Sequence, residues 1–373
     1  MVRSKSPIQA LLIAGAAIAL PLAVVPAASV AETAQPRSSA PVSVASGLDN
    51  PRQITFKKGV GFLIAEAGVG GKGPCMPGPE GSPVCFGKSG AITRLRGGNL
   101  ERLVKKLPSL ADKDGAGAIG PSDVIPYGDH RIAFTVGLGA DPAVREDLPK
   151  KGRWMAMLVA ANLRGGHQDG ELKEIADLGG FEARENPHPT APDSNPVSVL
   201  KKKKKFLVTD AGGNDWLKVH RDRGVKVLAV FPDRSYAGSD EFQAVPTSVV
   251  KGPDGAYYIS QLTGFPFVMN AAQIYRAVPG EAPTVYASGL TNVTDLGWHN
   301  GTLYAVQISD AGLASGGPPI GSLRQVVPGG TTHPAVAAGL FAPYGVAFKG
   351  SNAYVTTCAV CPNKGEVMSV PLG

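Results

Sequence analysis

Six stretches of this sequence begin with related text, and this internal repeat restricts the possible folds more than any other feature of the chain. The stretches are NPRQITF at Asn50, GPSDVIP at Gly120, NPVSVL at Asn195, VPTSVV at Val245, NVTDLGW at Asn292 and APYGVAF at Ala342. The last four starts lie 50, 47 and 50 residues apart, whereas the first two intervals are 70 and 75 residues and each holds an insertion. A recurring period of this length predicts repeated supersecondary units.

Each start is followed by further apolar segments that recur in the same order. A second segment, such as GVGFLIAEAG or KKFLVTDAGG, comes after turn-forming text, for example KGPDG at Lys251–Gly255. Third and fourth segments follow, such as AQIYRAV and PTVYASGL. Short apolar strands separated by tight turns are typical of antiparallel sheets. Six copies of a four-stranded antiparallel unit predict an all-β fold, a six-bladed β-propeller.

The two ends of the repeat region are incomplete in complementary ways. The sixth unit stops after GEVMSVPLG and has no fourth strand, while PVSVASGL at Pro41–Leu48 resembles the fourth-strand text PTVYASGL. We therefore predict that the N-terminal strand pairs into the last blade and closes the ring, so that residues 41–373 form a single propeller domain. In the second unit, Gly170–Asn186 shows helical spacing of apolar residues, and we expect this helix to lie on one rim of the ring.

The first residues carry the pattern of a secretory signal peptide. Arg3 and Lys5 precede an apolar stretch, and Ser29 and Ala31 are small residues at the spacing that signal peptidase requires. We assign residues 1–31 to a cleaved signal peptide and residues 32–40 to a flexible tether, and we expect a secreted protein. A retained anchor is the alternative. No later segment approaches the ~20 apolar residues of a membrane span, so no stable membrane insertion is expected after cleavage.

The basic charge of the chain is concentrated in one place. The formal net charge is +7, and five of the lysines are adjacent, at Lys201–Lys205. Aromatic residues are not interleaved with this run, so we expect no nucleic-acid partner. We interpret the run as a solvated turn between two strands; weak attraction to an anionic cell-wall polymer is the alternative.

The chain has four cysteines, Cys75, Cys85, Cys358 and Cys361. Because thiols are oxidised outside the cytoplasm, we predict disulfide bonds. Three pairings are formally open. The local pairs, Cys75 with Cys85 and Cys358 with Cys361, would each close a short loop. Four thiolates could instead hold a zinc ion.

The segment TDAGGND at Thr209–Asp215 places two acids, an amide and two glycines at the end of an apolar strand. Superposing the second strands of the units puts Asp210 in register with polar residues of other blades. Because inner strands line a central channel, we expect these residues and the blade-entry residues to meet at one mouth, where ligands bind in such rings. The predicted ligand-binding residues are Glu66, Asp210, Asn214, Gln261, Gln307, Arg52, Asn195 and Asp295.

Some of these residues could hold a metal ion. Acid and amide oxygens suit a hard cation, and the candidate calcium ligands are Glu66, Asp210, Asn195 and Asp295. Calcium is the one cofactor considered, and none is firmly predicted. A polar ring can equally be a solvated channel, because loop ends meet water in every repeat. The sequence has no G-x-S-x-G, H-E-x-x-H or P-loop motif, so no catalytic residue is nominated.

The chain resembles the ScyD/ScyE family, exported bacterial proteins related to NHL-type propellers. The resemblance runs from about Pro41 to Gly373 and depends on ASGLDNPR, PCMPGPEGSPVCFGKSGAITRL, PDSNPVSVL, VTDAGGNDWLKV, VPTSVVKGPDGAYYISQLTGFPF, AQIYRAVPG and YASGLTNVTDLGW. It implies a propeller and export, and it supplies no catalytic residues. The five-lysine run and the terminal CAVC depart from the family pattern.

These observations favour a secreted propeller that binds a small molecule or an extracellular protein partner at its polar mouth, without catalysis. The alternative is a metal-dependent hydrolase or lactonase, in which Glu66 and Asp210 hold a cation that polarises a carbonyl. A purely structural scaffold is a third hypothesis, expected if the inserted helix covers the mouth.

Overall fold

The computed structural model describes residues 40–79, 81–163 and 171–373, which lie in one compact unit. The predicted signal peptide and all but the last residue of the predicted tether lie outside the described residues. Within the described part of the chain, no helix is long and apolar enough to cross a membrane.

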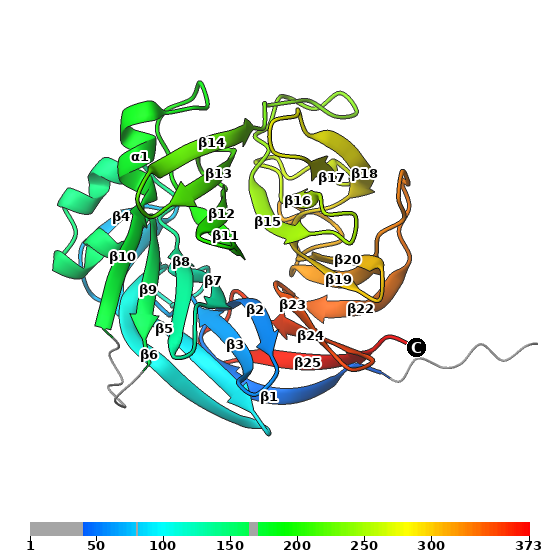
Figure 1. Ribbon diagram of the computed structural model, residues 1–373, viewed down its shortest axis with the longest axis horizontal. Coiled ribbons are helices and arrows are strands. Elements are labelled where there is room, and N and C mark those ends of the chain that lie inside the picture. The colour runs from blue at the N-terminus through cyan, green and yellow to red at the C-terminus, as the bar shows by residue number, and fades with distance from the viewer. Residues whose placement is uncertain (1–39, 80, 164–170) are drawn as a thin grey trace, which may run out of the picture. The chain divides into compact units, whose positions relative to one another are not determined.

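Six antiparallel sheets make up this unit, and we number them as blades 1 to 6 in chain order (Figure 1). The strands of blades 1 and 2 are β2 (Pro51–Lys57), β3 (Gly61–Glu66), β4 (Cys75–Pro77), β5 (Pro83–Arg96) and β6 (Asn99–Ala111), then β7 (Pro121–Pro126), β8 (Arg131–Val136), β9 (Met157–Asn162) and β10 (Glu171–Asp177). Blades 3 and 4 contain β11 (Pro196–Lys202), β12 (Lys205–Asp210), β13 (Asp215–His220) and β14 (Gly224–Val230), then β15 (Pro246–Lys251), β16 (Tyr257–Gln261), β17 (Ala272–Ala277) and β18 (Thr284–Leu290). Blades 5 and 6 contain β19 (Val293–His299), β20 (Thr302–Gln307), β21 (Ile320–Gln325) and β22 (Ala335–Phe341), then β23 (Val346–Lys349), β24 (Asn352–Thr357), β25 (Gly365–Pro371) and β1 (Val42–Leu48).

The first strands of the blades form the inner wall of a closed ring. Each contacts the first strand of the next blade, in the cyclic order β2, β7, β11, β15, β19, β23 and back to β2. The remaining strands of each blade follow outward, as Figure 1 shows. The prediction of a six-bladed propeller with antiparallel blades is therefore confirmed. Blades 2 to 6 have four strands, and blade 1 has a fifth because β4 and β6 both pair with the long strand β5.

The ring is closed by the N-terminal strand, as the text match between the chain ends predicts. Strand β1 pairs antiparallel with β25, from Val42 opposite Ser369 to Leu48 opposite Gly365. Leu48 is buried in an apolar cluster that also contains Val367 of blade 6 and Ile54 of blade 1. The first and last segments of the described chain therefore share one sheet and one core.

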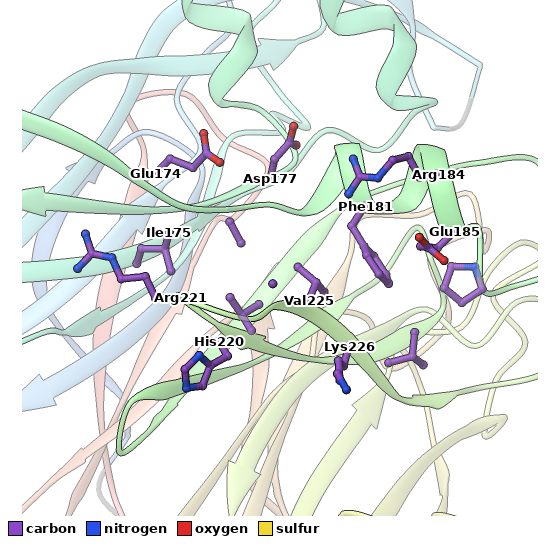
Figure 2. A pocket seen from close by; sticks show the side chains of 15 residues that line it. Glu174, Ile175, Asp177, Phe181, Arg184, Glu185, His220, Arg221, Val225 and Lys226 are labelled. Carbon is purple, nitrogen blue, oxygen red and sulfur yellow. The ribbon is translucent and has the colours of Figure 1, made fainter.

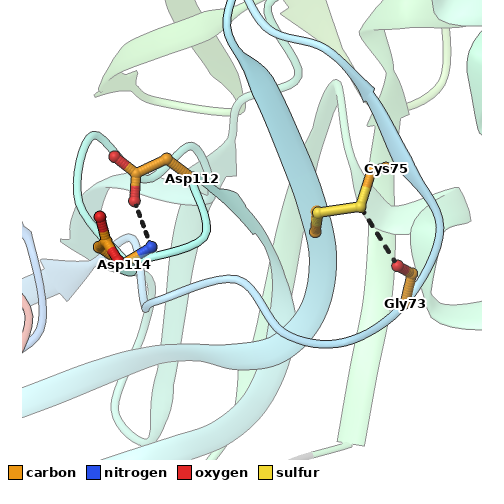
Figure 3. The surroundings of a disulfide bond; sticks show 5 residues. Gly73, Cys75, Asp112 and Asp114 are labelled. Carbon is orange, nitrogen blue, oxygen red and sulfur yellow. Dashed lines mark hydrogen bonds between the residues drawn. A yellow bond between two sulfur atoms is a disulfide. The ribbon is translucent and has the colours of Figure 1, made fainter.

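Both disulfides are local. Cys75 is bonded to Cys85 and Cys358 to Cys361, and none of the four thiols is left free to hold zinc. The first bond joins β4 to the paired end of β5, and Figure 3 shows it beside the backbone of Gly73. The second bond lies in the loop between β24 and β25.

The helix predicted over Gly170–Asn186 is wrong in its first half. Gly170 lies outside the described residues, and Glu171–Asp177 forms β10, the outermost strand of blade 2. Only α1 (Leu178–Glu185) is helical, capped by the side chain of Asp177. Pairing of β10 with β9 overrides the helical spacing, because blade 2 needs a fourth strand to cover its outer edge. Two 3₁₀ helices, η1 (Pro142–Glu146) and η2 (Lys150–Trp154), fill the insertion between β8 and β9.

Candidate functional site

Four of the predicted ligand residues occupy equivalent places in their blades. Glu66, Asp210, Gln261 and Gln307 are each the last residue of a second strand. Each is paired with the first residue of its inner strand, which is Pro51, Pro196, Pro246 and Val293 in turn. The register inferred by superposing the repeats is therefore present. All four side chains are buried.

The side-chain oxygens of these four residues accept hydrogen bonds from other groups of the chain. Glu66 Oε2 accepts the backbone N–H of Asp49 at 2.7 Å, Asp210 Oδ1 accepts that of Asn195 at 2.6 Å, and Gln307 Oε1 accepts that of Thr291 at 2.9 Å. Each donor belongs to the turn that enters the same blade. Three second strands thus end in a polar side chain that binds a backbone donor left unpaired by the entry turn. In blade 4 the donor to Gln261 is the Arg234 side chain. Ligand binding by these four residues stays a prediction.

Of the two predicted asparagines, Asn214 lies in the segment TDAGGND and Asn195 directly precedes β11. Asn214 is buried with a positive φ of 51°, and its side chain donates to the carbonyl of Gly212 and accepts the N–H of Val245 at the entry to blade 4. Asn195 is partly buried and carries the backbone N–H that binds Asp210. Asn214 therefore joins blades 3 and 4.

The structure does not assemble the four candidate calcium ligands. Asn195 and Asp210 are in contact, but Glu66 forms an ion pair with Arg102 of blade 1, at 2.7 Å, and Asp295 binds groups of blades 4 to 6. Within the described ranges, no three acid, histidine or cysteine side chains are placed so that they could hold a metal ion. The geometry gives no support to a calcium site made of these residues.

Asp295 belongs to a repeated set of contacts that we call the inter-blade belt. Each inner strand opens with a four-residue motif, and the belt residues are its third members: Gln53, Asp123, Ser198, Ser248, Asp295 and Gly345. At four interfaces the belt side chain accepts the backbone N–H of the fourth motif residue in the next blade. These bonds join Asp123 to Val199 (2.8 Å), Ser198 to Val249 (3.3 Å), Ser248 to Leu296 (3.2 Å) and Asp295 to Val346 (2.9 Å).

One belt residue bonds to blades that are not its neighbours in the ring. Gln53 of blade 1 donates to the carbonyl of Thr247 in blade 4, at 3.0 Å, and to that of Thr294 in blade 5, at 3.3 Å. Blade 4 lies opposite blade 1 in the ring, so the Gln53 side chain reaches across the axis. At the interface between blades 6 and 1 there is no room for a belt side chain, because a Cβ on Gly345 would lie 2.6 Å from the Cα of Gln53.

Arg52, the motif residue before Gln53, has few partners in the chain. Its guanidinium lies over the ring of Tyr344, 4.7 Å from the centroid, and donates to the carbonyl of Ala118. It forms no salt bridge with any described carboxylate. Burial lowers the pKa of Arg52, yet the residue remains partly accessible to solvent. An arginine that is both deep in the ring and unpaired is unusual, because buried charges are normally neutralised.

The segment TDAGGND lies in a cluster of four carboxyl groups that the sequence did not predict as a unit. The cluster contains Glu182 of α1, Asp193 of the entry to blade 3, Asp210 and Asp215. Neither carboxylate oxygen of Asp215 has a hydrogen-bond partner, although the residue is fully buried. No basic side chain of the described chain forms an ion pair with any of the four.

Close approach of these acids explains the two glycines of the segment. A Cβ on Gly212 would lie 2.5 Å from Asp193 Oδ1, and one on Gly213 would lie 3.1 Å from Glu182 Oε2. Neither glycine has a positive φ, and the left-handed residue of the turn is Asn214. The glycine pair makes room for the carboxylates, which is the one signal in the sequence that could have indicated the cluster.

Burial and mutual repulsion raise the pKa values of the cluster. Burial raises the pKa of Glu182 to about 7 and that of Asp193 to about 6, and the charge of Asp210 adds to both shifts. Burial, followed by the charges of Asp210 and Glu182, raises the pKa of Asp215 well above its ordinary value. Such carboxyl groups hold their protons more tightly in the folded chain than in the unfolded chain.

We expect Asp215→Asn to stabilise the protein at pH 8 by about 2 kcal/mol and to have little effect near pH 4, because the amide removes an unpaired buried charge that Asp210 and Glu182 repel. A carboxyl group with a raised pKa stabilises the folded state fully at pH values below its pKa in the unfolded chain, near 4. This stabilisation is lost as the pH rises toward the pKa of the group in the folded chain. Between about pH 4 and 8, the free energy of unfolding of the wild type should therefore fall more steeply with pH than that of Asp215→Asn. Urea unfolding at several pH values measures this. The exposed Asp222→Asn is the control; equal slopes for wild type and Asp215→Asn would contradict the prediction.

Comparison with known proteins supports the fold. No family model matches the sequence, and no curated protein matches it. Three similar solved structures are a putative oxidoreductase (glucose dehydrogenase) from Thermus thermophilus, the PQQ-bound aldose sugar dehydrogenase of Streptomyces coelicolor, and a carbohydrate-active enzyme of family AA12 from Trichoderma reesei. Their sequence identities to the chain are 14%, 11% and 11%, and their TM-scores are 0.52, 0.51 and 0.50. The matches cover 88%, 88% and 91% of this chain and 99%, 96% and 99% of the other chains. At these identities the similarity shows the fold alone.

Proposed function

We propose that this protein is a non-catalytic binding protein that recognises an anionic group of a small ligand at the mouth of its ring, through Arg52. The observation that carries the proposal is the guanidinium of Arg52, which lies inside the ring, is reached by solvent and has no carboxylate partner among the described residues. One of its donors binds Ala118. The others are suited to a ligand carboxylate or phosphate, which the planar guanidinium can bind with two parallel hydrogen bonds.

The surroundings of Arg52 favour binding of a ligand over a purely structural role. Tyr344 covers one face of the guanidinium and holds its orientation through a cation–π contact. Gln53 crosses the axis beside it, so a ligand would rest on the belt and would not pass through the ring. Preorganised donors of this kind bind anions more strongly than flexible surface lysines do.

We further propose that the chain is exported and related to the ScyD/ScyE family. The signal-peptide pattern of residues 1–31 supports export, and the two disulfides are typical of proteins in oxidising compartments. The sequence motifs quoted above support the family relationship. In the described residues, no observation favours the hydrolase alternative over binding, because the residues proposed to hold its cation are not gathered.

The proposal predicts that anion binding depends on Arg52. We expect acetate, citrate or inorganic phosphate to bind the wild type in calorimetric titrations at low ionic strength. Arg52→Gln should weaken binding at least about tenfold, because a hydrogen bond to a charged group contributes about 1.5–3 kcal/mol. Arg52→Lys should retain part of the affinity, since the charge remains but the paired geometry is lost.

The control is Arg94→Gln, which removes a partly exposed arginine that pairs with the exposed Glu101. This variant should bind anions as the wild type does. Equal affinities of wild type and Arg52→Gln for every anion in the panel would overturn the proposal, and so would a wild type that binds none of them. Calcium-dependent hydrolysis of a lactone that is lost in Asp210→Asn would support the hydrolase instead.

A further inference from the structure

A groove between blades 2 and 3 is a second candidate site, on the outer side of the ring and independent of Arg52. Its volume is about 980 Å³, at the upper end of the range of ligand pockets, which is about 300–1,000 Å³. One wall consists of β10 and α1, and the other consists of the end of β13 and the first half of β14. Figure 2 shows Phe181 and Val225 near its centre.

The floor of the groove is the outer end of the apolar core between the two blades. Ala176, Phe181 and Val219 belong to this core, with Ile175 and Val225 packed against it. Apolar surface continues onto Val227 of β14, which is 37% exposed. Ala176, Phe181 and Val219 are already buried, so the apolar surface open to a partner is that of Val227 and of the partly buried Ile175 and Val225. A partner that covers this surface gains about 25 cal/mol per Å² of apolar area.

Charged side chains of both signs surround this floor. Glu174 and Glu185 lie on the blade 2 side with Arg184, and Arg221 and Lys226 lie on the blade 3 side (Figure 2). All five are exposed, and none forms a salt bridge with a described residue. Asp177 differs, because it caps α1 and pairs with Arg145. A rim of mixed charge does not match a uniformly charged polymer, but it matches a peptide that carries both signs.

The strands along the groove have free edges. Strand β14 is the outermost strand of blade 3 and β10 that of blade 2, so each pairs with one neighbour only among the described strands. Every second backbone N–H and C=O on such an edge points away from the sheet without a strand partner. An extended peptide can bind these groups as an added strand, and its side chains then point alternately to the two faces of the sheet.

We propose that this groove binds an extended segment of a partner protein, which adds to the free edge of β14. Its apolar side chains would contact Phe181, Val225 and Val227, and its charged side chains of both signs would meet the rim. Alternation of apolar and charged residues is the pattern that a strand in this position requires, because one of its faces meets the core and the other meets water. The inference does not depend on the anion site.

A peptide display selection on the full chain tests the proposal. The probe is a library of random nine-residue peptides, and enriched peptides are synthesised with a fluorescent label for anisotropy titrations. We expect enriched peptides to alternate apolar and charged residues. The double variant Arg221→Glu/Lys226→Glu should bind them at least about tenfold more weakly. Hydrogen exchange of the β14 amides should slow when the peptide is present.

The matched control is Lys203→Glu/Lys204→Glu, the same change of charge at exposed positions of the β11–β12 turn in the same blade. It should leave peptide affinity unchanged. The proposal is overturned if selection enriches no peptide, if both double variants bind enriched peptides equally, or if binding protects amides elsewhere and leaves β14 unprotected. Val227→Lys offers a second variant at an exposed edge position, where the added charge should also weaken binding.

Discussion

Asp295→Ala is expected to lower the free energy of unfolding by about 3–5 kcal/mol. Asp295 Oδ2 accepts the N–H of Val346 at 2.9 Å, and Oδ1 accepts the Ser248 hydroxyl at 2.7 Å and the N–H of Leu296 at 2.8 Å. Alanine leaves these buried donors of three blades with fewer partners, and each unpaired donor costs about 1–3 kcal/mol. Urea unfolding followed by circular dichroism measures the change.

The chain itself supplies the matched control. Ser198 and Ser248 occupy the same belt position in blades 3 and 4, and each accepts the equivalent N–H of the next blade. We therefore expect Asp295→Ser to lose less than half of the stability that Asp295→Ala loses, although serine is only slightly larger than alanine. If the two variants unfold at the same urea concentration, the belt bond to Val346 does not contribute as inferred.

The same pair of variants separates hydrogen bonding from charge. Burial raises the pKa of Asp295 to about 8, so its contribution to stability is full near pH 4 and declines as the pH rises to 8. Neither serine nor alanine titrates, and both variants should lose this part of the pH dependence. The difference between them should therefore stay constant with pH.

The fold was predictable because every blade places the same physical requirements on its inner strand, so similar residues recur in the sequence. Every inner strand needs a turn before it and an apolar face against the next blade, and at four interfaces a polar side chain also bonds to the next blade. These needs return at the text of Asn50, Gly120, Asn195, Val245 and their equivalents. The closing strand was predictable for the same reason. The N-terminal segment and β18 occupy the same outer position, so they carry similar residues.

The candidate site was less predictable, because register fixes where a residue lies and not what its side chain binds. Glu66, Asp210 and Gln307 share one position, and each binds a backbone donor of its own entry turn. The polar ring seen in the sequence is therefore explained in part by the demand for satisfied backbone groups, which every blade repeats. The proposal for Arg52 rests on its lack of a carboxylate partner among the described residues, and the sequence alone cannot indicate that lack.

The carboxyl cluster and the outer groove depend on packing between segments of different blades. Glu182 comes near Asp215 only because α1 follows an outer strand of blade 2 and folds against the entry to blade 3. The sequence around Glu182 favoured one long helix, whereas the structure divides it into β10 and α1. A spacing of apolar residues that fits a helix cannot indicate that a neighbouring sheet still needs its outermost strand.

Deletion of residues 1–48 is expected to have the largest effect on the protein. It removes β1, leaves blade 6 with three strands and exposes the edge of β25 along its whole length. It also removes Leu48 from the cluster that joins blades 6 and 1, and burial of one such side chain contributes about 1.5–3 kcal/mol. With the strand bonds lost as well, the total approaches the whole stability of an ordinary domain, about 5–15 kcal/mol.

The control is deletion of residues 1–39, which keeps β1 intact. This variant should unfold cooperatively, as the full chain does, whereas the longer deletion should bind a dye specific for exposed apolar surface and aggregate through the β25 edge. Asp49 and Asn50 are kept in both variants, because their side chains bind Arg102, Asn363, Gly68 and Gly115.

A peptide covering residues 40–48, added to the longer deletion, tests whether the strand acts by pairing alone. We expect it to restore cooperative unfolding at millimolar concentration, because a strand that binds only the folded ring stabilises it by mass action. A peptide with Leu48 replaced by aspartate should fail, since the side chain enters a buried cluster. If the deletion of residues 1–48 unfolds at the same urea concentration as the deletion of residues 1–39, ring closure does not depend on this strand and blade 6 is stable with three.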